Sequence, residues 1–140
     1  MIRVGLERGR INTAAIEAEV SDDLSGAMAT FSGTVRQDEN GSLESLSYEA
    51  YEEMALKEMQ RICDEAAARF RVRNIAAVHR VGVVPVGESS VFIAVASGHR
   101  KEAFRACEFI IDSIKETVTI WKKEIYRDGR GVWVEGAGSK

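Results

Sequence analysis

The sequence is poor in the residues that mark several common classes of protein. Its 140 residues include two cysteines, two histidines and one proline. Neither Cys63 nor Cys107 has a second cysteine or histidine nearby at metal-ligand spacing, so we expect no metal site and no disulfide framework. Both cysteines fall in amphipathic patterns, which predicts two buried thiols in a reducing compartment. A glycine-rich phosphate loop, a nucleophile elbow and a zinc motif are also missing.

Long apolar runs and a strong excess of one charge are missing too. No segment approaches the roughly 18 apolar residues of a membrane span, and the N-terminus lacks the zones of a signal peptide. We therefore expect a cytoplasmic protein that does not bind membranes. The net charge of -3 argues against a nucleic-acid-binding domain, which would show a basic face with exposed aromatic residues.

The composition and the hydrophobic pattern predict one α+β domain over residues 1–140. Hydrophobic residues make up 45% of the chain, enough for one core. Several predicted strands are joined by short turns rather than helices, which favours a mixed sheet with helices packed on it. The segment 83–88 contains the only proline and is predicted to be a turn, and 136–140 a frayed tail. The expected strands are 1–6, 27–36, 43–51, 73–81, 89–96, 120–127 and 131–135, and the expected helices are 13–20, 52–70 and 101–116.

A basic cluster stands where an apolar strand gives way to a helix. Ser97, Gly98, His99, Arg100 and Lys101 follow one another there. The free backbone N–H groups and the dipole at a helix start attract anions, and the guanidinium of Arg100 suits a phosphate group. The alternative is a solvated helix start at which Arg100 and Lys101 face water and His99 is a cap.

A pair of lysines leaves the expected polar face near the end of the third helix. Lys115 follows Ile111 by one helical turn and is expected at the edge of the buried stripe. In an extended segment, Lys122 shares a face with Ile120 and points towards packed surface. The two lysines could converge on one pocket as fixed cations, proton donors or nucleophiles. Alternatively, both stems lie along the core and both ammonium groups reach water.

Three other features carry weaker signals. Residues 31–36 read Phe-Ser-Gly-Thr-Val-Arg, a strand end with Arg36 at its exit, which is either a ligand contact or an arginine at a sheet rim. His79 lies in a strand pattern and is predicted to be structural. Trp121 and Trp133 are predicted to pack on the core.

These segments, in this order, resemble the large-subunit family of molybdopterin synthase, often called MoaE. The resemblance covers about residues 27–135 and rests on the combination of several short stretches. The stretches are Phe-Ser-Gly-Thr-Val-Arg at 31–36, Leu-Ser-Tyr-Glu-Ala-Tyr at 46–51, Val-His-Arg-Val-Gly at 78–82, Ser-Gly-His-Arg at 97–100, Ile-Lys at 114–115 and Ile-Trp-Lys-Lys-Glu at 120–124.

The resemblance implies an α/β-hammerhead fold and a sulfur-transfer function. It implies a central homodimer that binds two small ubiquitin-like subunits, giving a heterotetramer. Each small subunit would donate sulfur from its C-terminal thiocarboxylate to cyclic pyranopterin monophosphate, forming the dithiolene of molybdopterin. No tightly bound cofactor or metal is implied. A non-catalytic paralogue that only binds a ubiquitin-like partner is the alternative, and joint retention of the basic residues argues against it.

The resemblance also assigns roles to individual residues. Lys115 resembles the essential lysine beside the inserted tail, and Lys122 the second lysine of that pocket. His99 and Arg100 resemble substrate anchors that reach in from the neighbouring subunit. Thr34 stands where the family often has lysine, and the tail after Glu135 is short, so both places depart from the family pattern. The expected substrate-binding set is Thr34, Val35, Arg36, His99, Arg100, Lys115, Lys122, Lys123 and Glu124.

Overall fold

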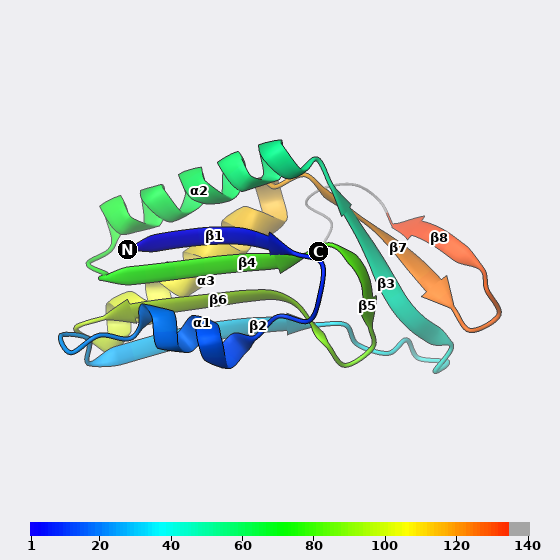
Figure 1. Cartoon of the computed structure of the whole chain (residues 1–140), viewed down its shortest axis with the longest axis horizontal. Helices are drawn as coiled ribbons and strands as arrows, with labels where there is room; N and C mark the ends of the chain where they lie inside the picture. Colours follow the sequence, from blue (N-terminus) through cyan, green and yellow to red (C-terminus); the bar gives the residue numbers. More distant parts are fainter. Residues whose placement is uncertain (135–140) are drawn as a thin grey trace.

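The computed structural model describes residues 1–134 and places two sheets end to end (Figure 1). Each sheet has four strands, and three helices pack on the first one. In chain order the elements are β1 (Ile2–Glu7), α1 (Thr13–Val20), β2 (Ala27–Thr34), β3 (Leu43–Ala50), α2 (Glu52–Arg69), β4 (Asn74–Arg80), β5 (Gly82–Pro85), β6 (Ser89–Ser97), α3 (Arg100–Thr117), β7 (Ile120–Tyr126) and β8 (Gly131–Val134).

The first sheet forms the centre of the main layer. Its strand order is β1-β4-β6-β2, with β1 parallel to β4 and the other pairs antiparallel. The helices α2 and α3 cover one face, and α1 covers the other (Figure 1). Because both faces are covered, β6 is buried along almost its whole length, as expected for an uninterrupted apolar strand.

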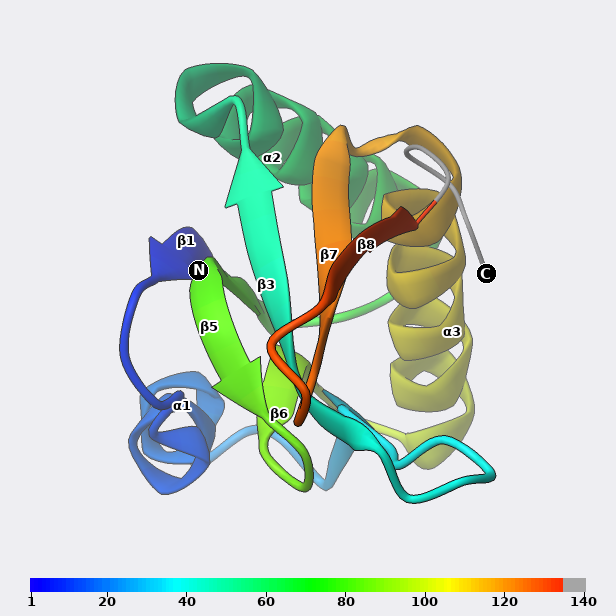
Figure 2. The ribbon, with the colours of Figure 1, turned by 90° about the vertical axis from the view of Figure 1, so that its right-hand side faces the viewer.

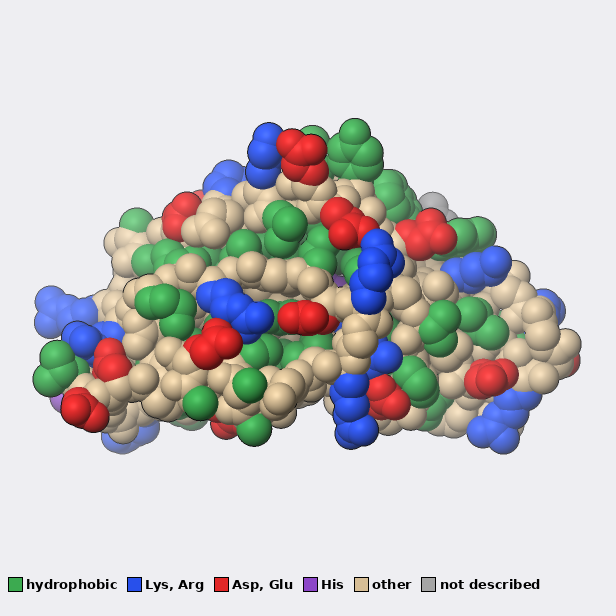
Figure 3. Space-filling view, viewed as in Figure 1, with side chains coloured by type: hydrophobic (Ala, Val, Ile, Leu, Met, Phe, Trp, Pro, Cys, Tyr) green, Lys and Arg blue, Asp and Glu red, His purple; other side chains and the backbone are tan. Residues whose placement is uncertain are grey.

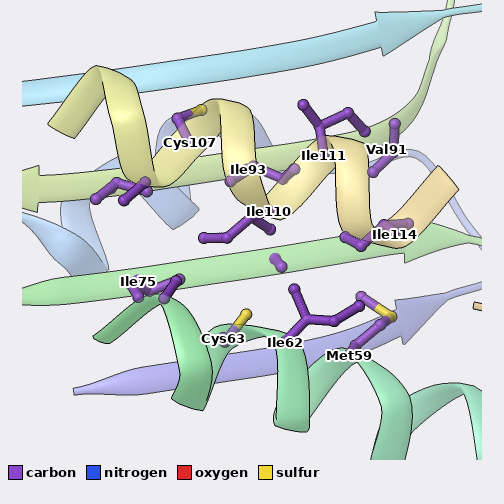
Figure 4. Packing of buried hydrophobic residues seen from close by; sticks show 14 of the residues in the cluster. Met59, Ile62, Cys63, Ile75, Val91, Ile93, Cys107, Ile110, Ile111 and Ile114 are labelled. Carbon is purple, nitrogen blue, oxygen red and sulfur yellow. The ribbon is translucent and has the colours of Figure 1, made fainter. Parts of the chain in front are cut away.

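The main core lies between the first sheet and the pair α2 and α3 (Figure 4). Met59, Ile62 and Ile110 project from the two helices and are at most 1% exposed. They contact Ile75 and Ile93 on the sheet within one cluster. The helices form because their apolar residues recur at helical spacing and so produce one continuous buried stripe.

The second sheet extends beyond the end of the first. Its order is β5-β3-β7-β8, all antiparallel. Figure 2 looks onto this end and shows β3 and β7 side by side, with the last turn of α3 leading into β7. A small core of Val35, Leu43, Tyr48 and Val84 ties the end of β2 to this sheet.

The predicted α+β class is confirmed, with several local corrections. The expected single mixed sheet is in fact two sheets. The turn predicted at 83–88 was wrong in its first part, because β5 runs from Gly82 to Pro85 and pairs with β3. Pro85 is tolerated because β5 is an edge strand. Trp121 and Trp133 are 40% and 53% exposed, so the prediction that they pack on the core was also wrong. Glu135 and the predicted tail 136–140 lie outside the described residues.

Candidate active site

The two predicted lysines come together where the main layer meets the second sheet. Lys115 stands in the last turn of α3, and Val118, the residue that follows the helix, is in extended conformation. The β-branched residues that follow favour a strand, so the chain turns directly into β7, which carries Lys122. Lys122 is half-buried, whereas Lys115 is exposed rather than at the core edge. Burial and the charge of Lys115 lower the pKa of Lys122, while Glu124 opposes this effect.

Two buried aromatic side chains lie beside the lysines. His79 is 7% exposed and Tyr48 is 9% exposed. Their ring centroids are 5.1 Å apart in an edge-to-face arrangement. Tyr48 stands directly opposite Lys122 in the antiparallel pair of β3 and β7. Burial, with a smaller effect of the charges of Lys115 and Lys122, lowers the pKa of His79 to about 4, although the hydrogen bond to the Arg80 carbonyl opposes this shift. The ring is therefore uncharged at neutral pH.

Sequence reasoning missed this part of the site. His79 was predicted to be a structural histidine because no Cys, Asp or Glu stands beside it at metal-ligand spacing, and its burial agrees with that prediction, but its position beside the lysines was not foreseen. Its neighbours Tyr48, Lys115 and Lys122 come from three other elements. The motif Val-His-Arg-Val-Gly in the family resemblance was the one available signal.

The end of β2 brings three predicted residues to the same junction of the two sheets. Thr34 ends the strand and is exposed, and Val35 is 3% exposed in the small core. The backbone of Val35 donates to the Glu88 carbonyl at 3.0 Å and accepts from Gly87 at 2.7 Å. These bonds fix the chain just before Arg36, whose side chain is exposed. Val35 therefore has a packing role, and Arg36 is available to a ligand.

The two residues after Lys122 in β7 point in opposite directions. Side chains alternate along a strand, so Lys122 and Glu124 share one face of β7 and Lys123 lies on the other. The Nζ atom of Lys123 lies 5.5 Å from the ring centroid of Trp133. Glu124 accepts a hydrogen bond from the Tyr126 hydroxyl at 3.1 Å.

His99 and Arg100 occupy the opposite end of α3. Both are exposed, His99 is the N-cap residue, and its side chain makes no capping hydrogen bond. Two hydrogen bonds fix the turn between β6 and α3. Ser97, which is fully buried, donates its hydroxyl to the His99 carbonyl, and the Gly26 amide donates to the Ser97 carbonyl at 2.9 Å.

The two basic groups of α3 are too far apart to hold one small substrate within one chain. Arg100 begins the helix and Lys115 lies in its last turn. Fifteen helical steps at about 1.5 Å each separate them by roughly 22 Å along the axis. The end of α3, the start of β7 and the end of β2, which carry Lys115, Lys122 and Arg36, lie where the two sheets meet, whereas the start of α3 with His99 and Arg100 lies at the far end of the first sheet (Figure 1).

The two thiols take no part in either group. Cys63 and Cys107 are both free and buried, which confirms the expected burial. Burial raises the pKa of Cys63 to about 12 and that of Cys107 to about 11. Neither side chain is a nucleophile at neutral pH.

Two other kinds of feature are absent from residues 1–134. In this part of the chain, no three His, Cys, Asp or Glu side chains are grouped so that they could hold a metal ion. No helix there has both the length and the apolar character needed to cross a membrane. On the face seen in Figure 3, lysine and arginine side chains alternate with acidic ones rather than forming a basic field.

Known proteins with similar sequences and structures point to one family. The model of the MoaE protein family matches residues 6–117. A molybdopterin synthase catalytic subunit from Dictyostelium discoideum is 52% identical over 113 residues, which are 79% of this chain and 72% of that protein.

Solved structures agree with this relationship. The crystal structure of molybdopterin synthase from Staphylococcus aureus matches with a TM-score of 0.87 and 39% identity, covering 93% of this chain and 95% of that one. A chain in the complex of subunits 1 and 2 of molybdopterin-converting factor from Helicobacter pylori matches with a TM-score of 0.81. It is 24% identical, covers 94% of this chain and 90% of that chain, and adds evidence for the fold alone. By its sequence over most of its length and by its fold, this chain belongs to the MoaE protein family.

Proposed function

We propose that this chain is the catalytic subunit of a molybdopterin synthase and acts as a sulfurtransferase. It would move sulfur from the C-terminal thiocarboxylate of a small ubiquitin-like carrier subunit to cyclic pyranopterin monophosphate. The observation that carries the proposal is the convergence of Lys115 and Lys122 from two different elements, in a chain of the MoaE family. We also place the reaction in the cytoplasm, where two free thiols remain reduced.

The chemistry requires fixed positive charge at this place. In each transfer the thiocarboxylate sulfur bonds to a side-chain carbon of the pterin as a carbon–oxygen bond at that carbon breaks and its oxygen leaves. Water then cleaves the acyl–sulfur bond, so that the sulfur stays on the pterin and the carrier is left with a carboxylate. The donor is an anion before the transfer and an anion after it. Preorganised cations in a partly dehydrated site stabilise such developing charge strongly. Lys115 and Lys122 supply this charge, and no bound cofactor is needed because the carrier brings the sulfur.

The phosphate of the pterin needs a second set of donors. Arg36, exposed at the end of β2, lies on the lysine side of the molecule. His99 and Arg100 lie at the far end of α3 and can contribute only to the site of another copy. The proposal therefore includes a homodimer with two shared sites, each served by one small subunit.

The activity is tested by reconstitution. The purified chain is mixed with thiocarboxylated small subunit and cyclic pyranopterin monophosphate, and molybdopterin is measured. We expect product only when all three are present. Product formation from inorganic sulfide at the same rate, without the carrier, would contradict the carrier model.

The shared site is tested by mixing two inactive variants. Lys115→Ala and Arg100→Ala homodimers should each be nearly inactive, because every site lacks one necessary group. Random exchange makes about half of the dimers mixed, and each mixed dimer has one intact site of two. Activity should return to about a quarter of the wild-type value per chain. Demonstrated subunit exchange without recovery would show that Lys115 and Arg100 do not belong to different chains of one site.

A further inference from the structure

His79 is buried beneath the end of α3, on the side of the first sheet that carries the lysine pair. It shares a face of β4 with Ile75 and Ala77, and both pack in the cluster that contains Ile114 of α3 and Val118 just after the helix. Its ring contacts Tyr48, which stands directly opposite Lys122 in the pair of β3 and β7. The charges of Lys115 and Lys122 lower the pKa of His79. His79 thus lies on the face of the first sheet that α3 covers and beside the Tyr48–Lys122 pair of the second sheet, and only 7% of it is exposed.

The hydrogen bonding of the ring fixes which nitrogen is free. Nδ1 lies 2.8 Å from the Arg80 carbonyl oxygen. A carbonyl can only accept, so Nδ1 carries the hydrogen and the neutral ring leaves a lone pair on Nε2. In the described part of the chain, Nε2 has no hydrogen-bond partner. The uncharged ring therefore offers one unused acceptor near two cations.

Tyr48 holds the ring in this orientation. Its ring meets His79 at an interplanar angle of 68°. Burial raises the pKa of Tyr48, and the nearby Ser90 side chain opposes this effect. Ser90 in turn donates to the Gly33 carbonyl at 3.1 Å. This chain of contacts links β4 to the end of β2, so the histidine has little freedom to turn away.

We propose that His79 is a positioning residue of the lysine site, whose Nε2 accepts a hydrogen bond from the Lys115 ammonium during the reaction. An uncharged acceptor suits this task better than a carboxylate would. A carboxylate would neutralise the ammonium, whereas a neutral imidazole orients it and leaves its full charge to face the reacting anion. The inference rests on the proposed function, because it assigns His79 a part in that reaction.

The first test does not depend on catalysis. The chain has two histidines, so NMR of ¹⁵N-labelled protein can follow both rings, with the exposed His99 as an internal reference. We expect a pKa of about 4 for His79 and an Nε2 that carries no hydrogen. In Lys115→Ala the pKa of His79 should rise, because a nearby positive charge has been removed. Lys57→Ala, which changes an exposed lysine on α2, is the control and should leave it unchanged. Hydrogen on Nε2, or an unaltered titration in Lys115→Ala, would overturn the proposal.

The second test measures turnover in the reconstituted enzyme. His79→Leu removes the acceptor and should lower kcat by about tenfold to a hundredfold, the usual effect of one hydrogen bond to a charged group. KM for the pterin should stay near the wild-type value, and His79→Gln, which keeps an acceptor oxygen, should recover most of kcat. Val78→Ala is the matched control, because Val78 is also buried in β4 but faces α1. It should lose stability and keep kcat.

Equal losses of kcat in His79→Gln and His79→Leu, or a wild-type kcat in folded His79→Leu, would refute the positioning role. If wild-type protein makes no molybdopterin, the proposed function fails, and the NMR result still decides whether His79 and Lys115 interact. If His79→Leu does not fold, the comparison of wild type with Lys115→Ala remains a complete test.

Discussion

Replacing Gly26 by alanine should displace the turn that positions His99 and Arg100 and so lower activity, although neither of these residues is changed. A Cβ at Gly26 would lie 2.5 Å from the carbonyl oxygen of Gly98. Carbon and oxygen atoms in contact normally stay about 3.3 Å apart or more. The obstacle is backbone on both sides, so no side chain can turn aside to make room.

The size of the effect follows from this overlap. The Gly98 carbonyl must move by roughly 0.8 Å, and the next two residues are His99 and Arg100. A displacement of about 1 Å at a positioning group can cost about a hundredfold in rate. Overpacking of this kind destabilises a fold by about 1–3 kcal/mol, so the protein should stay folded. We therefore expect kcat/KM for the pterin to fall by about tenfold to a hundredfold in Gly26→Ala.

The assay is molybdopterin formation by the reconstituted enzyme, with thermal unfolding measured on the same samples. Gly5→Ala is the matched control, because a Cβ at Gly5 would meet nothing within 4 Å. It should keep wild-type kcat/KM and melting temperature. A folded Gly26→Ala protein with wild-type kcat/KM would refute the reasoning, since it would mean either that the turn does not move or that its position is irrelevant to the substrate.

Three other expectations follow from the structure. Lys115→Ala should reduce turnover by about a hundredfold to a thousandfold, the usual loss for one electrostatic group at a reacting centre, while the exposed position of Lys115 leaves the melting temperature nearly unchanged; full activity would exclude the catalytic role. The hydrogen bond from Ser25, together with Arg73, lowers the pKa of Asp22 from 3.8 to about 2. Folded Asp22 binds protons more weakly than the unfolded chain, so its stabilising effect is complete above about pH 5 and is lost as the pH falls through 2. Asp22→Asn should therefore melt earlier than wild type at neutral pH and together with it near pH 2, and a difference that is independent of pH would contradict this. Finally, iodoacetamide at neutral pH should alkylate neither Cys63 nor Cys107 until the protein is unfolded, as measured by mass spectrometry; rapid labelling of folded protein would show that the thiols are accessible.

The fold could be predicted from the sequence where local patterns determine it. The apolar stripes of α2 and α3 and the uniform apolar run of β6 gave the right elements, because burial on one face or on two leaves a direct trace in the sequence. The pattern does not say which strand pairs with which. That is why one sheet was expected instead of two, and why Pro85 was taken to exclude a strand that lies at a sheet edge.

In the candidate site, too, only the residues that local patterns bring together could be predicted. Lys115 and Lys122 could be singled out because they lie seven residues apart around a helix end, so local geometry brings them together. His79 and Tyr48 could not, because each reaches the lysines through contacts between elements distant in the chain. The exposure of Trp121 and Trp133 was missed for a similar reason, since an aromatic residue in a strand looks the same whether its face is covered or open.

The length of the α3 helix fixes the separation of the two basic groups. Arg100 and Lys115 stand at its two ends, and the number of residues between them sets both the length and the angle that separate the two groups. Removing one residue would shorten this distance by about 1.5 Å and rotate one end against the other by about 100°. In the proposed symmetric homodimer, this displacement would occur in both sites. Exposed residues along α3 can therefore be substituted during evolution. A single insertion or deletion within the helix should be selected against, whichever residue is gained or lost.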